Sequence, residues 1–299
     1  MCVVAVKYFD GVGFVGAKNR DRNYLPSIQI VQSNRTGVQR LYIDDLKSRY
    51  TEGLNEFGLC ILSASLSVKS DEKEGDKVDA YQRKRNDPGF MSPDGKTIRD
   101  ALLLKKPMQA IDLLIDRELS GCTIVFNAEE CYLLEGGFTV KKQDATEENP
   151  REYNHKVLRV KDQVVRTNHG ILIPELGYDS NSEDPYFKKS RKSSEIRLKY
   201  SSNSVSRNDK PLDMLDAISV SPDKDTFMNP VRTGDPSKGD MVTTGQLMLV
   251  PKDRTLHYRP LFSEVQFKYS KLNGPEAKTF FEIISSKKLL GFKELHGIK

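Results

Sequence analysis

The first 21 residues constrain the fold most, because they predict a β-hairpin at the N-terminus. The run Cys2–Phe9 is rich in valine and aromatic residues and predicts a strand. Residues 10–13, Asp-Gly-Val-Gly, predict a turn, and residues 14–17 predict a returning strand. The hairpin would bring residues 18–21, Lys-Asn-Arg-Asp, back to the level of Cys2. We therefore expect the N-terminus to be held in a sheet beside charged side chains.

Cys2 is the candidate nucleophile of this stretch. Met1 precedes a small residue, so aminopeptidase trimming is expected to make Cys2 the first residue of the mature chain. One residue then holds a thiol, with a pKa of about 8.5, and an α-amine, with a pKa of about 7.7–8.0. The amine can accept the thiol proton, and the thiolate is a nucleophile. The alternative is that position 2 merely tolerates a small residue, so other segments must decide.

Composition limits the classes of protein to consider. The 299 residues are 37% hydrophobic and 30% charged, which is typical of a chain with a buried core and a solvated surface. No apolar run approaches the roughly 20 residues that cross a membrane, and no N-terminal basic segment precedes a long apolar one. We therefore expect no membrane association and a cytoplasmic location. The net charge of +5 does not establish nucleic-acid binding.

The cysteines give no sign of a metal site. Cys2, Cys60, Cys122 and Cys131 lack metal-ligand spacing, and we expect no metal and no other cofactor. Cys60 and Cys122 lie in apolar strand patterns, so both are expected to be reduced core thiols.

The order of predicted elements indicates an α+β protein. Strand patterns are grouped together along the chain, and a pair of helices, expected at residues 97–105 and 107–119, is inserted between them. A further helix is expected at residues 274–286. We find no internal repeat.

Two polar segments are expected to be loop insertions within a single domain over residues 1–299. Residues 68–95 are rich in Lys, Glu, Asp, Gly and Pro, and residues 178–206 in Ser, Asn, Asp and Lys. The second segment carries a basic cluster that could contact a phosphate or an acidic partner, made of Lys188, Lys189, Arg191 and Lys192.

Four short motifs occur in the order seen in one enzyme family. They are Cys2 itself, Lys-Asn-Arg-Asp ending at Asp21, Asn-Glu-Phe-Gly-Leu starting at Asn55, and Thr-Asn-His starting at Thr167. In this order they resemble the cysteine N-terminal nucleophile (Ntn) hydrolases. Two branches are similar: choloylglycine hydrolase with penicillin V acylase, and acyl-CoA:isopenicillin N acyltransferase. The resemblance spans residues 2–261 and implies a four-layered αββα sandwich of two antiparallel sheets between helical layers.

The resemblance implies a role for each matching residue. Cys2 would be the nucleophile, with its own α-amine as the base. Asp21 would bind that amine and set its protonation. Asn55 and Asn168 would form the oxyanion hole, although asparagine also favours turns for purely structural reasons. Arg207 is the best match for the family's second active-site arginine.

Three supporting residues depart from the family pattern or flank it. Lys18 stands where these enzymes usually have arginine; it would keep a positive charge near the thiolate but lacks the bidentate fork. Arg20 is one position from Asp21, and regular alternation would place the two on opposite faces of the strand. His169 is expected to have a supporting or structural role, since the α-amine is the base in this pattern.

The expected function is hydrolysis of a linear, non-peptide C–N amide bond through a thioester, with a small-molecule acyl amide as substrate. An acyltransferase that passes the acyl group to an amine or alcohol uses the same residues and is a second hypothesis. A non-catalytic binding protein that contacts nucleic acid through the basic loop is a third. The resemblance leaves a homo-oligomer open, since relatives often assemble.

Overall fold

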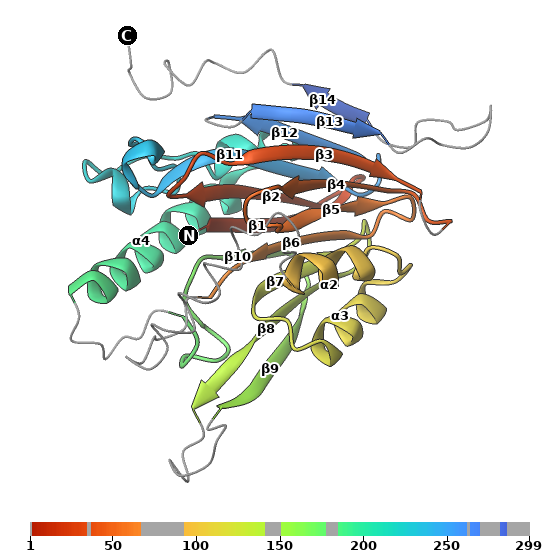
Figure 1. Ribbon diagram of the computed structural model, residues 1–299, viewed down its shortest axis with the longest axis horizontal. Helices are drawn as coiled ribbons and strands as arrows, with labels where there is room; N and C mark the ends of the chain where they lie inside the picture. The colour runs from red at the N-terminus through yellow and green to blue at the C-terminus, as the bar shows by residue number, and fades with distance from the viewer. Residues whose placement is uncertain are drawn as a thin grey trace.

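The protein is a sandwich of two β-sheets with helices on both outer faces (Figure 1). The computed structural model describes residues 2–34, 37–66, 93–140, 151–177, 185–261, 264–269 and 282–285. Everything below refers to this part of the chain.

The first sheet has six strands in the order β10-β1-β2-β11-β12-β14. β1 and β2 are the predicted N-terminal hairpin, and they lie inside the sheet rather than at its edge. Neighbouring strands are antiparallel except β12 and β14, which are parallel. The strands are β1 (Cys2–Phe9), β2 (Gly13–Arg22), β10 (Gln163–Arg166), β11 (Val242–Val250), β12 (Thr255–Pro260) and β14 (Glu282–Ser285).

The second sheet has eight strands in the order β13-β3-β4-β5-β6-β7-β8-β9. Its neighbours are also antiparallel, apart from the parallel pair β13 and β3 at one edge. The strands are β3 (Ser27–Ser33), β4 (Arg40–Asp45), β5 (Thr51–Asn55), β6 (Cys60–Ala64), β7 (Gly121–Phe126), β8 (Cys131–Val140), β9 (Arg151–Val160) and β13 (Glu264–Tyr269).

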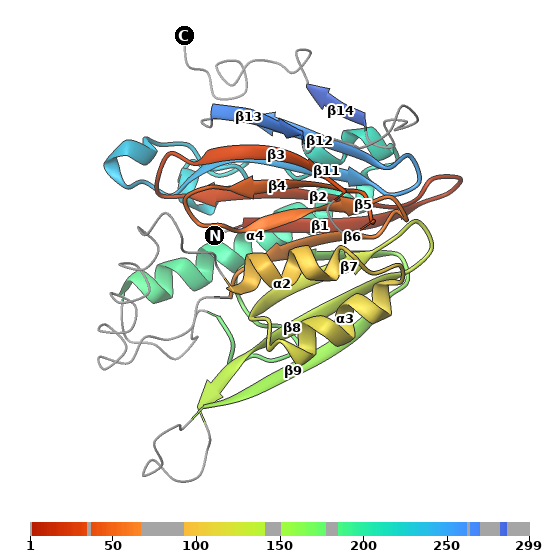
Figure 2. The same cartoon turned by 45° about the vertical axis from the view of Figure 1, so that its right-hand side comes forward.

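Helices cover the outer face of each sheet (Figure 2). α2 (Pro93–Ala101) and α3 (Pro107–Asp116) pack on the eight-stranded sheet, and α4 (Pro185–Arg207) and α5 (Met214–Ala217) pack on the six-stranded sheet. The expected αββα layering is therefore confirmed. Short 3-10 turns occur at η1 (Pro211–Asp213), η2 (Thr226–Met228) and η3 (Pro236–Lys238).

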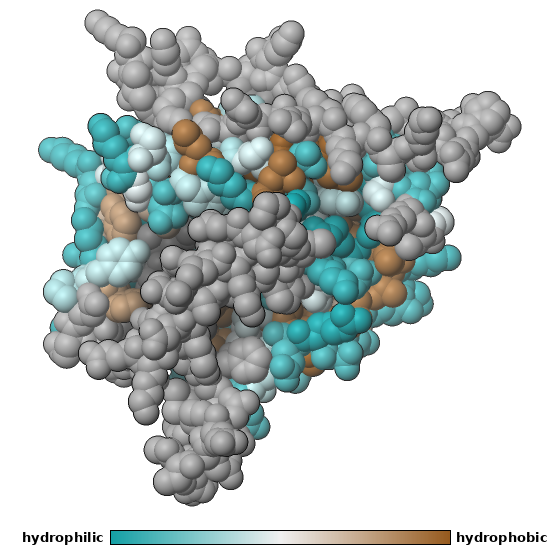
Figure 3. Space-filling view, in the orientation of Figure 1, coloured by the Kyte–Doolittle hydropathy of each residue, from teal (hydrophilic) through white to brown (hydrophobic). Residues whose placement is uncertain are grey.

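Strand alternation sorts the apolar residues into three cores. In β1, Val4 and Val6 point into the core between the sheets, while Val3 and Ala5 point towards α4 and α5. A third core lies between the eight-stranded sheet and the α2–α3 pair. On the face seen in Figure 3, most described side chains are hydrophilic and the apolar ones form small separate patches. Because both faces of each sheet are covered, central strands such as β6 and β7 are completely buried and mostly apolar.

Helix α4 overturns part of the sequence interpretation. Residues 178–206 were expected to be a loop, but Pro185–Arg207 form a helix of 23 residues. The pattern was hidden because the buried face of α4 is polar and made mostly of serine, at Ser190, Ser193, Ser194, Arg197, Ser201 and Val205. Serine side chains are small enough to let the helix approach the sheet closely.

Two other expected segments fall largely outside the described residues. The loop expected at residues 68–95 lies mostly in undescribed sequence, and α2 begins at its end, at Pro93. The helix expected at 274–286 is described only at Glu282–Ser285, where the chain is the strand β14. The expected helix pair is confirmed as α2 and α3.

Candidate active site

Cys2 is the first residue of β1, held between β10 and β2. It is 4% exposed and belongs to the core between the sheets, so its thiol lies on the inner face of the six-stranded sheet. Cys2 pairs with Arg20 across the hairpin. The predicted hairpin thus places Cys2 beside the charged end of β2.

Asn168 lies against the backbone of Cys2. The Cys2 nitrogen donates a hydrogen bond of 2.6 Å to Asn168 Oδ1, and Asn168 Nδ2 donates to the carbonyl oxygen of Ser65 at 2.6 Å. Helix α4 fixes this asparagine, because Ser194 Oγ accepts a hydrogen bond of 2.9 Å from the Asn168 backbone nitrogen. The structure therefore brings Cys2 and Asn168 together, although 166 positions separate them in sequence.

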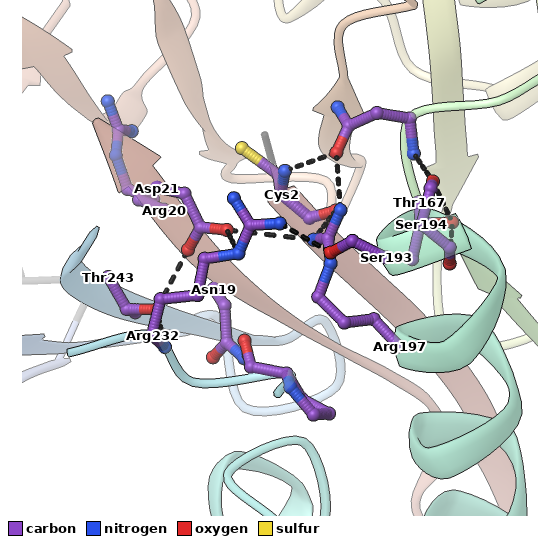
Figure 4. A network of polar contacts seen from close by, with 12 residues as sticks. Cys2, Asn19, Arg20, Asp21, Thr167, Ser193, Ser194, Arg197, Arg232 and Thr243 are labelled. Atoms are coloured by element: carbon purple, nitrogen blue, oxygen red, sulfur yellow. Dashed lines mark hydrogen bonds and ion pairs between the residues drawn. The ribbon is translucent and has the colours of Figure 1, made fainter. Parts of the chain in front are cut away.

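Asp21 points to the opposite face of the six-stranded sheet and is fully buried among two arginines (Figure 4). Its Oδ1 accepts a hydrogen bond of 2.8 Å from Thr243 Oγ1. Its Oδ2 lies 3.6 Å from Arg197 Nη1 and 3.9 Å from Arg232 Nε, yet has no hydrogen bond. Asp21 is thus the carboxylate that both buried arginines share.

Arg197 links this carboxylate to Cys2. It comes from α4, and its side chain is completely buried. Arg197 Nη1 donates to the carbonyl oxygen of Cys2 at 3.4 Å, and Nη2 donates to Asn168 Oδ1 at 3.4 Å. One guanidinium therefore contacts Cys2, Asp21 and Asn168.

Arg232 is held in place by the segment that precedes β11. Its backbone nitrogen donates to Thr243 Oγ1 at 2.9 Å, and Nη2 donates to Ser193 Oγ at 2.7 Å. Asn19 ties the same segment to β2, because its Nδ2 donates to the carbonyl oxygen of Pro230 at 2.9 Å. These contacts bring Arg232 to Asp21 from far along the chain.

Lys18 and Arg20 lie on the inner face of the sheet, on the same side as the Cys2 thiol. Both are 1% exposed and both bind Glu52 of β5, Arg20 at 2.8 Å. Arg20 also lies 3.7 Å from Asp45 of β4. The expected alternation holds, because Arg20 and Asp21 point to opposite faces.

Positive charges lower the pKa of the Cys2 thiol to about 7. Burial by itself raises this pKa, because it disfavours the charged thiolate. The charges of Lys18, the chain's N-terminal amine and Arg22 outweigh burial, while Asp21 opposes them. Burial raises the pKa of Cys60 well above the ordinary value, and at Cys122 burial together with Glu135 does the same against the opposing charge of Arg166. The pKa of Cys2 is therefore shifted in the opposite direction from those of these two core thiols.

Asn55 does not join this group. Its Nδ2 donates to the carbonyl oxygens of Leu102 and Leu104, at 2.9 and 2.7 Å, and its Oδ1 accepts from the backbone nitrogens of Phe57 and Leu59, each at 3.0 Å. Both amide hydrogens fix the link between α2 and α3, and Oδ1 fixes the turn that follows Asn55. The Asn55 side chain has no hydrogen left to donate to an oxyanion.

Arg207 also lies apart from the buried cluster. It is exposed at the C-terminal end of α4. Arg197 and Arg232 are the arginines that reach Asp21. Arg197 falls at helical spacing among the buried serines of α4, and this pattern could have indicated from the sequence that Arg197 is buried. We find no such local pattern around Arg232.

His169 contacts Ser194 of α4 and Thr167. Its Nδ1 lies 2.8 Å from Ser194 Oγ and 3.2 Å from Thr167 Oγ1. Burial lowers the pKa of His169 to about 4, with Arg191 acting in the same direction. The ring is therefore neutral at physiological pH.

Replacing His169 with glutamine is expected to make the protein less sensitive to acid. Between pH 6.5 and about 4 the folded protein keeps His169 neutral, whereas the unfolded chain protonates it. The unfolded state then binds more protons, so the stability of the folded state falls as the pH drops through this window. The denaturant midpoint of the wild type should therefore fall more steeply than that of the variant between pH 6.5 and about 4. Parallel curves would contradict a buried neutral His169.

The described residues offer no group of side chains that could form a metal centre. No group of three or more His, Cys, Asp or Glu side chains in this part of the chain could hold a metal ion. Cavities of about 490 and 360 Å³ lie around the β9–β10 connection, beside α4 and β1 respectively. Among the described helices, none is long and apolar enough to cross a membrane.

The two sheets with helices on both outer faces form an αββα sandwich of the Ntn-hydrolase type. Among solved structures, the N-acylethanolamine-hydrolyzing acid amidase ortholog of Caenorhabditis elegans is similar, with a TM-score of 0.50 and 12% identity over 84% of this chain and 93% of that one. This likeness shows the fold, and it confirms the resemblance inferred from the sequence at that level.

Two further solved structures are less similar. Penicillin V acylase from Agrobacterium tumefaciens has a TM-score of 0.42 and 11% identity, over 87% of this chain and 86% of that chain. Conjugated bile acid hydrolase from Clostridium perfringens has a TM-score of 0.42 and 9% identity, over 87% and 89%. The sequence matches no family model and no curated protein.

Proposed function

We propose that the protein is a cysteine amidohydrolase that cleaves a linear, non-peptide amide through a thioester on Cys2. The observation that carries the proposal is the lowered pKa of the Cys2 thiol, together with the Asn168 amide beside the Cys2 nitrogen and the buried Asp21 carboxylate, which Arg197 links to Cys2. These are a nucleophile, a polarising amide and a binding site for an ammonium group.

Removal of Met1 would supply the base. The Cys2 nitrogen would become an α-amine that still lies 2.6 Å from Asn168 Oδ1. Asp21 Oδ2 is buried without a hydrogen bond, and a newly freed ammonium group is a suitable donor for it. The α-amine takes the thiol proton, and the thiolate attacks the amide carbonyl carbon.

The remaining steps follow from the same groups. Attack forms an S–C bond and moves the carbonyl electron pair to oxygen, which gives a tetrahedral oxyanion. Asn168 Nδ2 donates one hydrogen to Ser65, and its second hydrogen would stabilise this oxyanion. The α-ammonium returns its proton to the leaving nitrogen as the C–N bond breaks. Water then attacks the thioester, which releases the acid and restores the thiol.

The likeness to an amidase named for N-acylethanolamine hydrolysis supports an amide as the substrate. Acyl transfer to an amine or alcohol uses the same thioester, and no observation favours it. Nucleic-acid binding through α4 has weak support, because Lys189 and Arg191 of its basic cluster are ion-paired with Asp225 and Glu195. We also propose a cytoplasmic location and a single domain over residues 1–299, without a loop insertion at 178–206.

The test is capture of the acyl group on Cys2. Intact mass first establishes whether Met1 is absent, and the protein is then incubated with acyl p-nitroanilides from acetyl to palmitoyl. We expect release of p-nitroaniline and a thioester mass on the Cys2 peptide. Cys2→Ala should abolish both, because the remaining described thiols are buried and have raised pKa values.

The matched control is Cys131→Ala, which removes a buried thiol far along the sequence and should retain the acyl adduct. Turnover by Cys2→Ala, or full activity in protein that keeps Met1, would overturn the mechanism.

A further inference from the structure

A row of buried charges of alternating sign crosses the space between the two sheets. Lys18 and Arg20 share Glu52, and Arg20 and Arg22 share Asp45. The Arg20–Glu52 contact is 2.8 Å, the Arg20–Asp45 contact 3.7 Å and the Arg22–Asp45 contact 3.2 Å. Four of the five side chains are at most 1% exposed, and Arg22 is 14% exposed.

The row ends at the sulfur atom of Cys2. Arg22 Nη1 lies 3.8 Å from Cys2 Sγ, within hydrogen-bonding distance for sulfur. Strand alternation explains the contact, because Lys18, Arg20 and Arg22 share one face of β2 and the Cys2 side chain lies on the same inner face. Arg22 thus contacts the atom that would react.

Arg22 is held in this direction from more than one side. Its Nε lies 3.2 Å from Asp45 Oδ2, and its Nη1 donates at 2.8 Å to the carbonyl oxygen of Asp21. The Tyr24 hydroxyl donates at 2.8 Å to the same Asp45 oxygen, which steadies the carboxylate. The planar guanidinium suits this fixed geometry better than a lysine ammonium group.

The charges of the row balance only when Cys2 is an anion. Lys18, Arg20 and Arg22 supply three positive charges, whereas Glu52 and Asp45 supply two negative ones. An excess charge of either sign is costly inside a protein unless a partner neutralises it. A thiolate at the end of the row would be the third anion.

We propose that this row of charges stabilises Cys2 as a thiolate, and that Arg22 is the catalytic cation that binds its sulfur. The proposal rests on the proposed function, since it assigns Arg22 to the same nucleophile. Neither the sequence motifs nor the family resemblance pointed to this residue.

The thiol pKa is consistent with this arrangement. Burial raises it, and Lys18, the N-terminal amine and Arg22 bring it down to about 7. The charged groups around the thiol come from several elements: Lys18, Arg20, Asp21 and Arg22 of β2, Asp45 of β4, Glu52 of β5 and Arg197 of α4.

The test measures thiol reactivity without any substrate. Iodoacetamide labels the full chain over a range of pH, and mass spectrometry of the Cys2 peptide gives the labelling rate. We expect an apparent pKa of about 7 in the wild type. Arg22→Met should raise it by about one unit, which makes labelling at pH 7 roughly fivefold slower. Arg22→Lys should fall between the two, because it keeps the charge and loses the fork.

The control is Arg99→Met on α2. Arg99 is also partly buried and binds Thr51 at 2.6 Å and Asp44 at 3.5 Å, on the helical side of the other sheet. Its profile should match the wild type. An unchanged profile in folded Arg22→Met would overturn the proposal; if that variant does not fold, an unchanged profile in Arg22→Lys would do so.

The labelling test of Arg22 and the test of amide hydrolysis can fail independently of each other. If no amide is cleaved but the Arg22 variants shift the labelling profile, the role of Arg22 in stabilising the thiolate is supported and the proposed hydrolysis is refuted. If Cys2 forms an acyl adduct and the Arg22 variants label like the wild type, the hydrolase stands and the role of Arg22 is refuted.

Discussion

Replacing Asp21 with alanine is expected to lower the free energy of unfolding by about 3–5 kcal/mol. Asp21 is the carboxylate shared by Arg197 and Arg232, and all three side chains are completely buried. Removing it leaves two guanidinium groups in the interior without their common anion. It also removes the acceptor of the Thr243 hydroxyl. The loss should exceed that of most single substitutions.

Chemical denaturation with circular dichroism measures this loss. Asp21→Asn is the informative second variant, because it keeps the shape and an acceptor for Thr243 while removing the charge. Asp209→Asn is the matched control, since Asp209 is exposed on the surface, and it should leave the midpoint unchanged. A folded Asp21→Ala protein as stable as the wild type would show that the arginines do not depend on this carboxylate.

The two asparagines expected from the sequence should behave differently when each is replaced with alanine. Asn168→Ala is expected to slow amide hydrolysis by about 10²–10³, because it removes the donor to the oxyanion. Asn55→Ala should cost about 1–3 kcal/mol of stability, because it leaves buried backbone groups without partners. Its turnover per folded molecule should stay near that of the wild type.

Both effects can be separated in one set of measurements. The rate of p-nitroaniline release, divided by the active-site concentration from Cys2 labelling, gives turnover per folded enzyme. Thermal unfolding of the same samples gives stability. If Asn55→Ala instead lost turnover at full stability, Asn55 would return to the oxyanion hole and its contacts with Leu102 and Leu104 would have to be rearranged in the active enzyme.

The N-terminal hairpin illustrates what local pattern can predict. Alternation along residues 2–22 placed Arg20 and Asp21 on opposite faces, and the structure has them so. The same pattern contained Arg22, which lies on the face of Lys18 and Arg20, but nothing local connected it to the thiol. Its role depends on Asp45, which comes from the other sheet.

From local periodicity and turn residues, the sequence by itself predicted an α+β chain, the inserted helix pair and the position of Cys2 in a strand beside charged residues. The αββα layering was implied only by the resemblance to the Ntn hydrolases. Only the tertiary structure revealed which arginines pair with Asp21, which backbone groups bind Asn55, and that residues 185–207 form a helix. Arg197 and Arg232 are more than 170 positions from Asp21 in sequence and meet it because α4 and the segment before β11 pack on the same face of the six-stranded sheet. A polar residue is buried only when distant partners satisfy it, and those partners are absent from any local window of sequence.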